Sequence, residues 1–218
     1  MAFSFPRIYP ILDSSILDSS IVLAAGRGEF LHRLGSELAG SGVTLLEYRN
    51  KTGSDAEILS DAAILRAAMP AQNVKLILDD RVDLIERAGF DGVHVDAGDL
   101  SAAEARRLLG PARMVGAFGG SDAFLPGMLE APADYLAIGP VYPTTTKQTS
   151  AAPIGVEGVR RLREQAGPGK ILTAAAGITL ESAPGVLAGG ANAVAVAAAI
   201  FRAPNPAAEF RRWLAVLG

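Results

Sequence analysis

Residues 75–95 of the chain, KLILDDRVDLIERAGFDGVHV, contain one complete unit of the expected fold. The apolar run Lys75–Leu78 predicts a strand, and Val82–Ala88 has apolar residues at helical spacing before Gly89, which favours the end of a helix. Gly92–Val95 predicts a second strand. Strands this short and apolar that alternate with helices are typical of a parallel sheet with helices on its outside.

The same alternation of strand and helix runs through the chain and is its only repeat. Strands are predicted at Arg7–Leu12, Thr44–Arg49, Lys75–Leu78, Gly92–Val95, Met114–Ala117, Tyr135–Ile138, Ile171–Ala175 and Ala193–Ala197. Helices are predicted at Gly28–Gly40, Asp55–Met69, Val82–Ala88, Ser101–Leu109, Ala123–Leu129, Val156–Gln165, Leu180–Ala188 and Ala207–Leu217. Because such units close into a barrel more readily than they form an open sheet, the expected fold class is α/β, a single (β/α)8 TIM barrel domain over residues 1–218.

The composition narrows the classes of function. The 218 residues are 50% hydrophobic, carry a net charge of −3 and include no cysteine, which excludes disulfides, thiolate metal sites and a cysteine nucleophile. The mixed charges predict no nucleic-acid partner and no membrane partner. No apolar run is long enough to span a bilayer, and residues 1–7 lack the pattern of a signal peptide, so we expect a soluble, cytoplasmic protein.

In such a barrel, function lies on the loops that follow the strands, so polar residues there are the candidates for a site. After the second predicted strand, Glu47, Arg49 and Lys51 alternate and should point to one face. Two cations on that face can hold phosphate oxygens, Arg with a planar fork and Lys as a point charge. The alternative is an ordinary strand end with solvated charges.

Acidic residues follow the next two predicted strands. Asp79 and Asp80 end the third, and Asp96 and Asp99 follow the fourth. Neighbouring strands bring these carboxylates together, and their mutual repulsion favours a cation between them, for which Mg²⁺ is the natural candidate. The alternative is helix capping, by Asp79 or Asp80 before Val82 and by Asp99 at the following helix.

Three further loops offer contacts to an anion. The segment Gly139–Lys147 after the sixth strand has three threonine hydroxyls and a lysine that can all face one anion. Gly177, after the seventh strand, allows the backbone to approach an oxyanion closely, and a helix opens at Ala197 and Ala198 after the eighth strand. Barrels of this size often bind a phosphate between the last two loops.

The loop Gly139–Lys147 resembles the corresponding loop of thiamine-phosphate synthases, and the resemblance extends from Arg7–Asp13 to Val194–Val196. Members of that family join an aminopyrimidine methyl pyrophosphate to a thiazole phosphate, release pyrophosphate and use Mg²⁺. The resemblance implies that the C–O bond to pyrophosphate breaks first and that the thiazole nitrogen captures the resulting pyrimidine methyl cation. It also implies phosphorylated pyrimidine and thiazole substrates as partners, and it is compatible with a homo-oligomer.

The family's Gln-x-Arg-x-Lys motif appears here as Glu47-Tyr48-Arg49-Asn50-Lys51, and its Asn-Asp pair appears as Asp79-Asp80. The resemblance implies that Arg49, Lys51 and Lys147 are catalytic and bind the pyrophosphate. It further implies that Asp80 and Asp99 are ligands of Mg²⁺. The substrate-binding residues that it implies are Glu47, Tyr48, Arg49, Asn50, Lys51, Asp79, Phe118, Thr144, Thr145, Thr146, Lys147, Gly177, Ala197 and Ala198.

The chain departs from the family pattern at several of these positions. Glu47 replaces Gln and Asp79 replaces Asn, so each adds negative charge near a pyrophosphate, and a carboxylate at position 47 cannot donate a hydrogen bond. Phe118 takes the place of a Ser that has a His nearby, and Ala176 and Ala198 replace a Gly and a Ser. Each lost phosphate contact is expected to cost about 1–3 kcal/mol.

These departures keep two alternatives open, a non-catalytic binding or regulatory paralogue and a thiazole tautomerase-like enzyme. The missing histidine argues against the tautomerase, which needs a residue for proton transfer. Outside the motifs, Gly26–Gly28 is expected to be a loop. His94 is expected to pack or to hydrogen-bond at its strand end, and Trp213 to cover the bottom of the barrel or an oligomer contact.

Overall fold

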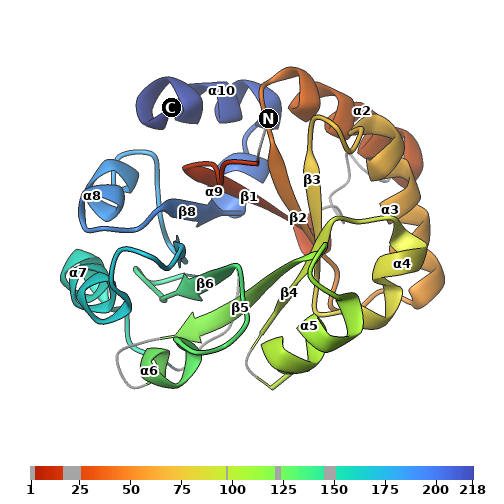
Figure 1. Ribbon diagram of the computed structural model, residues 1–218. Coiled ribbons are helices and arrows are strands. Elements are labelled where there is room, and N and C mark those ends of the chain that lie inside the picture. Colours follow the sequence, from red (N-terminus) through yellow and green to blue (C-terminus); the bar gives the residue numbers. More distant parts are fainter. Residues whose placement is uncertain (1–2, 17–25, 97, 121–123, 145–150) are drawn as a thin grey trace.

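The computed structural model describes residues 3–16, 26–96, 98–120, 124–144 and 151–218. Its strands pair in parallel in the order β1 to β8, and β8 pairs back to β1, so that the barrel is closed. Figure 1 shows the strands surrounded by the helices, with the last helix lying beside the N-terminal end of the chain. The predicted TIM barrel is confirmed.

The strands are β1 Ile8–Asp13, β2 Leu45–Arg49, β3 Lys75–Asp79, β4 Gly92–Val95, β5 Met114–Gly120, β6 Tyr135–Ile138, β7 Leu172–Ala175 and β8 Ala193–Val196. The α-helices are α2 Arg27–Gly40, α3 Asp55–Ala68, α4 Ile85–Ala88, α5 Ala102–Leu109, α6 Leu125–Met128, α7 Gly155–Ala166, α8 Ala183–Ala188, α9 Ala198–Phe201 and α10 Pro206–Leu217. Two 3-10 turns, η1 Ser14–Ile16 and η2 Val82–Leu84, complete the described elements. None of the helices in these ranges is long and apolar enough to cross a membrane.

Many element ends differ from the predictions by one to three residues, and three of the differences involve local structure. Strand β5 runs on to Gly120 because a shift of register after Phe118 lets it continue beside β6. The helix predicted around Ala123–Leu129 is the single turn α6 within the described residues. Of the expected loop Gly26–Gly28, only Gly26 lies outside a helix: it is the N-cap of α2, with a φ of 79°, and the helix begins at Arg27.

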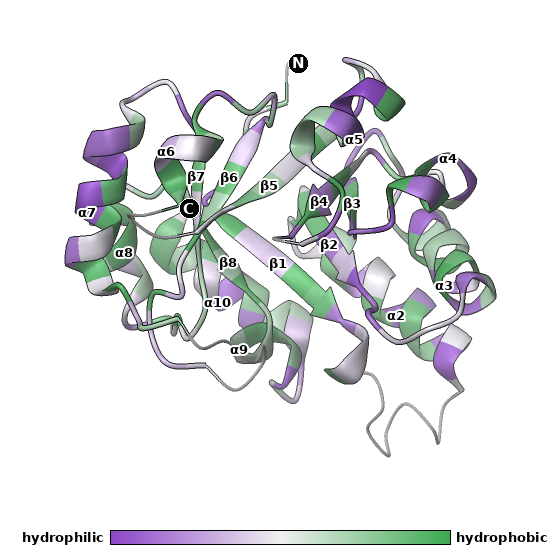
Figure 2. Cartoon of the chain, turned by 90° about the horizontal axis from the view of Figure 1, so that it is seen from below, coloured by the Kyte–Doolittle hydropathy of each residue, from purple (hydrophilic) through white to green (hydrophobic). Residues whose placement is uncertain are grey.

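Two apolar layers hold the barrel. The larger lies between the strands and the helices, and it includes Trp213, which is fully buried and donates its indole N–H to Glu209 at 3.0 Å. This burial assigns Trp213 to the core and removes it as an oligomer contact. The smaller layer fills the barrel itself with Tyr9, Leu45, Ile77, Tyr135 and Ala195. In Figure 2, helix α7 carries its hydrophilic residues on the side away from the strands, as expected for a helix that covers a barrel.

The amino ends of the strands are held by an arginine arrangement that recurs in helices α3, α5 and α7. Arg66, Arg106 and Arg163 each bind carbonyl groups of two neighbouring loops and one side chain placed just before a strand. Those side chains are Asp91, Asp134 and Asn192, and they accept from the backbone N–H groups of Leu76, Val115 and Leu172. The arginine arrangement therefore recurs in every second strand-helix unit, whereas the repeat found in the sequence is one strand-helix unit.

Candidate active site

A cavity of about 560 Å³ opens at the carboxyl ends of the strands. Every strand contributes at least one residue to the lining of this cavity, and several of the loops after the strands contribute more. The lining includes Asp13, Glu47, Arg49, Asp79, His94, Asp96, Phe118, Gly139, Thr144, Gly177, Ala197 and Ala198. The cavity therefore lies where βα loops carry function in this fold.

Strand β2 sends alternate side chains into the cavity. Glu47 and Arg49 line it, whereas Tyr48 donates its hydroxyl hydrogen bond to Asp61 of α3, on the outer side of the strand. Asn50 donates to Tyr48 Oη at 3.1 Å and also belongs to this outer network. The predicted common face of Glu47, Arg49 and Lys51 is confirmed for Glu47 and Arg49, whereas Lys51 lies beyond the end of the strand and is not among the lining residues. The structure places Tyr48 and the Asn50 side chain away from the cavity, because the strand alternation turns them outward.

The outer network includes an arginine that the sequence interpretation missed. Arg27 binds the carboxylate of Asp61 through Nε and Nη2, and its Nη2 also lies 3.1 Å from Glu57. Asn50, which also belongs to this network, accepts a hydrogen bond on Oδ1 from the backbone N–H of Gly53 at 2.8 Å, and this bond holds the turn that carries Lys51. A signal existed in the sequence, because Asp61 stands on the apolar face of its helix, where a carboxylate needs a partner.

Arg49 at the end of β2 and Lys51, two residues later, are both paired with carboxylates. Arg49 Nη1 lies 2.5 Å from Asp13 Oδ2, and its Nε lies 3.5 Å from Asp79 Oδ2. Lys51 Nζ lies 3.1 Å from Asp79 Oδ2 and forms an ion pair with Asp80. An anion that binds here must therefore exchange these carboxylates for its own oxygens or arrive with a further cation.

Carboxylate oxygens of Asp79, Asp80 and Asp96 lie within 4.8 Å of one another. Asp99 lies outside this group, with a side chain 36% exposed and Oδ2 at 3.9 Å from Lys51 Nζ. Burial raises the pKa of Asp79 to about 6, against the opposing effects of Lys51 and Arg49. The structure therefore brings together carboxylates from the ends of β3 and β4, as the sequence predicts.

Helix capping does not account for these acids. The turn η2 has Arg81 at its N-cap and no side-chain cap, so neither Asp79 nor Asp80 caps it. Helix α5 is capped by Ser101, which accepts from the Glu104 N–H while the Glu104 carboxylate accepts from the Ser101 N–H. The capping box is that of the sequence pattern, and Asp99 takes no part in it.

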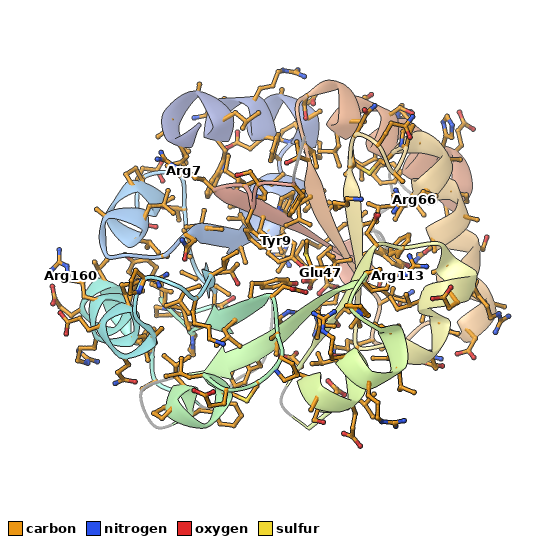
Figure 3. All side chains as sticks on the ribbon, in the orientation of Figure 1. Arg7, Tyr9, Glu47, Arg66, Arg113 and Arg160 are labelled. Carbon is orange, nitrogen blue, oxygen red and sulfur yellow. The ribbon has the colours of Figure 1, made fainter. Side chains whose placement is uncertain are left out.

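Glu47 lies at the floor of the cavity and is 3% exposed. Its Oε2 accepts a hydrogen bond of 2.7 Å from Tyr9, and the Tyr9 and Tyr135 hydroxyl oxygens are 2.6 Å apart. Burial and the neighbouring charge of Asp79 raise the pKa of Glu47 to about 8. Glu47 therefore holds its proton more tightly than an exposed carboxyl group does, which lessens the added negative charge expected at this position. Figure 3 shows Tyr9 and Glu47 together at the centre of the ring of strands.

The walls of the cavity on the side of β5 are aromatic. The rings of Phe118 and Phe124 have centroids 5.4 Å apart, and Phe118 faces the cavity where a hydroxyl was the family expectation. His94 is 7% exposed and stacks on Tyr135 with centroids 5.5 Å apart. The expectation that His94 packs at its strand end is confirmed.

The loops after β6, β7 and β8 form the next part of the wall. A Cβ atom at Gly177 would lie 2.4 Å from the carbonyl oxygen of Pro143, so these loops meet where only glycine fits. Ala176, just before it, has a φ of 77°. Thr144 lines the cavity, and α9 opens after Ala197 as predicted. The other predicted members of the β6 loop, Thr145, Thr146 and Lys147, lie outside the described residues.

Comparison with known proteins agrees with this geometry. Residues 16–200 match the family described as thiamine monophosphate synthase. The chain is 41% identical over 206 residues to a thiamine-phosphate synthase of Koribacter versatilis, with 94% of each chain covered, and 38% identical over 202 residues to one of Agrobacterium fabrum, with 91% of this chain and 88% of the relative covered. A solved thiamine phosphate pyrophosphorylase from Pyrococcus furiosus matches with a TM-score of 0.78 at 25% identity, over 97% of this chain and 98% of that one. The chain belongs to the thiamine monophosphate synthase family.

Proposed function

We propose that the protein is a thiamine-phosphate synthase that joins an aminopyrimidine methyl pyrophosphate to a thiazole phosphate and releases pyrophosphate. The observation that carries the proposal is that Arg49 and Lys51 both contact Asp79, and that Arg49 and Asp79 line one cavity. A cation pair next to a carboxylate group suits a substrate that bears several phosphate charges together with a metal ion.

In this reaction the protein forms no covalent bond to either substrate. The C–O bond to pyrophosphate breaks with its electron pair leaving on the pyrophosphate, and the lone pair of the thiazole nitrogen then bonds to the methylene carbon. Arg49 and Lys51 stabilise the charge that develops on the leaving group, and the cavity holds the two rings in line. Lys147 joins them on the strength of the family resemblance alone, because it lies outside the described residues.

The donor set suits Mg²⁺. This ion prefers a few carboxylate oxygens and completes its shell with water and substrate phosphates, and Asp80 shares its neighbourhood with other carboxylates. We assign Asp80 as a protein ligand from this cluster, and Asp99, which lies outside it, on the strength of the family resemblance alone. When bound, Mg²⁺ neutralises charge on the pyrophosphate. With a cation held by these acids, Lys51, which pairs with Asp80 here, would be available to contact the substrate pyrophosphate.

A second candidate is a binding or regulatory paralogue without turnover. It is favoured by Phe118, whose ring occupies the cavity wall where a phosphate-binding hydroxyl was expected. A tautomerase-like activity has less support, because β5 ends in Phe118-Gly119-Gly120 and offers no proton-transfer side chain there.

The test is an end-point assay with both substrates and Mg²⁺, in which thiamine phosphate is oxidised to a fluorescent product. We expect product in the parent protein, none after EDTA treatment, and strong losses in Asp80→Ala and Lys147→Ala. Asp83→Ala is the matched control, since Asp83 is an exposed acid nearby that pairs with Arg81. If the folded parent binds a substrate and forms no product, the paralogue takes the place of the synthase.

A further inference from the structure

Three polar groups form a chain inside the barrel, under the cavity. Tyr135, Tyr9 and Glu47 are each no more than 3% exposed, and their oxygens follow one another at 2.6 and 2.7 Å. Tyr135 is held in place by Gly116, where a Cβ atom would lie 2.0 Å from the tyrosine ring, and by the stacked ring of His94. The chain is therefore a fixed part of the core that ends at the ligand side.

The direction of the hydrogen bonds follows from the partners available. Tyr135 has no acceptor other than Tyr9 among the described residues, so its hydroxyl donates to Tyr9. Tyr9 in turn donates to Glu47 Oε2. The other oxygen of Glu47, Oε1, has no hydrogen bond within the described ranges, and Glu47 lines the cavity. A proton on this carboxyl group therefore lies on Oε1 and faces the ligand.

The charges around Glu47 decide whether that proton is present. Asp79 of β3 and Asp96, just after β4, face it and oppose its ionisation, whereas Arg49 of β2 and the Tyr9 hydrogen bond favour ionisation. Burial is the largest influence, and the resulting pKa of about 8 keeps the proton in place at neutral pH. Burial also raises the pKa values of Tyr9 and Tyr135 well above the usual value of 10.0, so both hydroxyls stay protonated.

We propose that Glu47 is a neutral hydrogen-bond donor whose Oε1–H, oriented by Tyr9 and Tyr135, selects a ligand ring with an unprotonated nitrogen acceptor. The inference rests on the proposed function for the nature of that ring. A buried donor that must find an acceptor discriminates strongly against rings that lack one, because the unpaired group stays desolvated. It also explains how Glu substitutes for the family's Gln, since both side chains then present a neutral donor.

The experiment uses the phosphate-free aminopyrimidine alcohol as the probe, so that neither metal nor cation contacts contribute. Its affinity is measured by calorimetry between pH 7 and 9.5 for the parent, Glu47→Gln and Tyr9→Phe. Above its pKa, Glu47 loses the donor, so parent affinity should fall about tenfold per pH unit, or about 30-fold in all. Glu47→Gln should bind with no such pH dependence. Tyr9→Phe should move the midpoint upward, because the lost hydrogen bond favoured the carboxylate.

Glu37→Gln, an exposed site on α2, is the matched control and should keep the parent profile. A second readout needs no ligand: the infrared carbonyl band of a protonated carboxyl should be present at pH 7 and absent in Glu47→Gln. Flat binding in the parent, or a band that Glu47→Gln retains, overturns the inference. If the pH-dependent binding is found without thiamine phosphate formation, only the proposed function fails; if product forms with flat binding, only this inference fails.

Discussion

Arg27 and Asp61 face each other behind strand β2, with Arg27 Nη2 at 2.7 Å and Nε at 3.0 Å from Asp61 Oδ2. The pair joins the first turn of α2 to the middle of α3, and through Tyr48 it reaches the strand that supplies Arg49 to the cavity. A contact between two helices on the outside of the barrel thus supports a side chain on the inside.

Asp61→Asn should destabilise the protein by about 3 kcal/mol, because it leaves Arg27 without its buried counter-charge. Asp61 has 3% side-chain exposure and Arg27 27%, which places the effect at the lower end of the range for buried pairs. Urea unfolding measures it. Asp55→Asn on the same helix is the control, since Asp55 is 57% exposed and should change stability by less than about 0.5 kcal/mol. Equal losses in both variants would contradict a buried pair.

Glu47 should make the protein less stable as the pH rises. Its pKa is about 8 in the folded state against 4.5 ordinarily, so between these values the folded state binds the proton more tightly than the unfolded state. The stabilisation is complete below about pH 4.5 and is lost as the pH rises through 8. Glu47→Gln should therefore gain on the order of a few kcal/mol over the parent at pH 9 in denaturant titrations. A difference between the two that does not change with pH would exclude a buried neutral acid.

The barrel itself could be predicted from sequence because its signals are local. Each strand is an apolar run and each long helix a periodic pattern, whereas the one-turn helix α6 carries too few residues for a reliable pattern. The neutral state of Glu47 could not be read in this way, because it depends on burial inside the closed barrel and on the charges of Asp79 and Asp96. The hydrogen bonds that orient Glu47 come from Tyr9, 38 residues away, and from Tyr135, 126 residues from Tyr9, which only barrel closure brings together. The role of Arg27 was missed for the same reason, because its partner stands 34 residues later.

Ala176 is a site where a smaller residue should stabilise the fold. Its φ of 77° lies in the left-handed region, which costs a residue with a Cβ about 1 kcal/mol more than glycine. Ala176→Gly should therefore raise the melting temperature. The neighbouring Gly177→Ala should lower it, since its new Cβ would meet the Pro143 carbonyl oxygen at 2.4 Å. A lower melting temperature for Ala176→Gly would show that the strain is absent.

Asn192 is the uncharged side chain among the three that the recurring arginines bind, and this suggests a stabilising substitution. Arg66 and Arg106 bind aspartates, whereas Arg163 binds Asn192. Asn192→Asp would make this pair ionic without changing its shape and should add about 0.5–1 kcal/mol in urea unfolding at low salt. Half of the gain or more should disappear at 1 M salt. Unchanged stability at low salt would mean that the carbonyl contacts of Arg163 already satisfy it.

Phe118 offers a direct test of the departure on β5. Phe118→Ser places a hydroxyl at the cavity wall, and one added hydrogen bond of about 1 kcal/mol should tighten Mg²⁺-pyrophosphate binding about fivefold. The loss of the contact with Phe124 should cost about 1–2 kcal/mol of stability, because Phe118 is only partly buried. Phe118→Ala loses the same ring and gains no hydroxyl, so the difference between the two variants in calorimetry isolates the hydrogen bond. If both variants bind pyrophosphate equally, the aromatic wall rather than the missing hydroxyl sets the affinity on this side of the cavity.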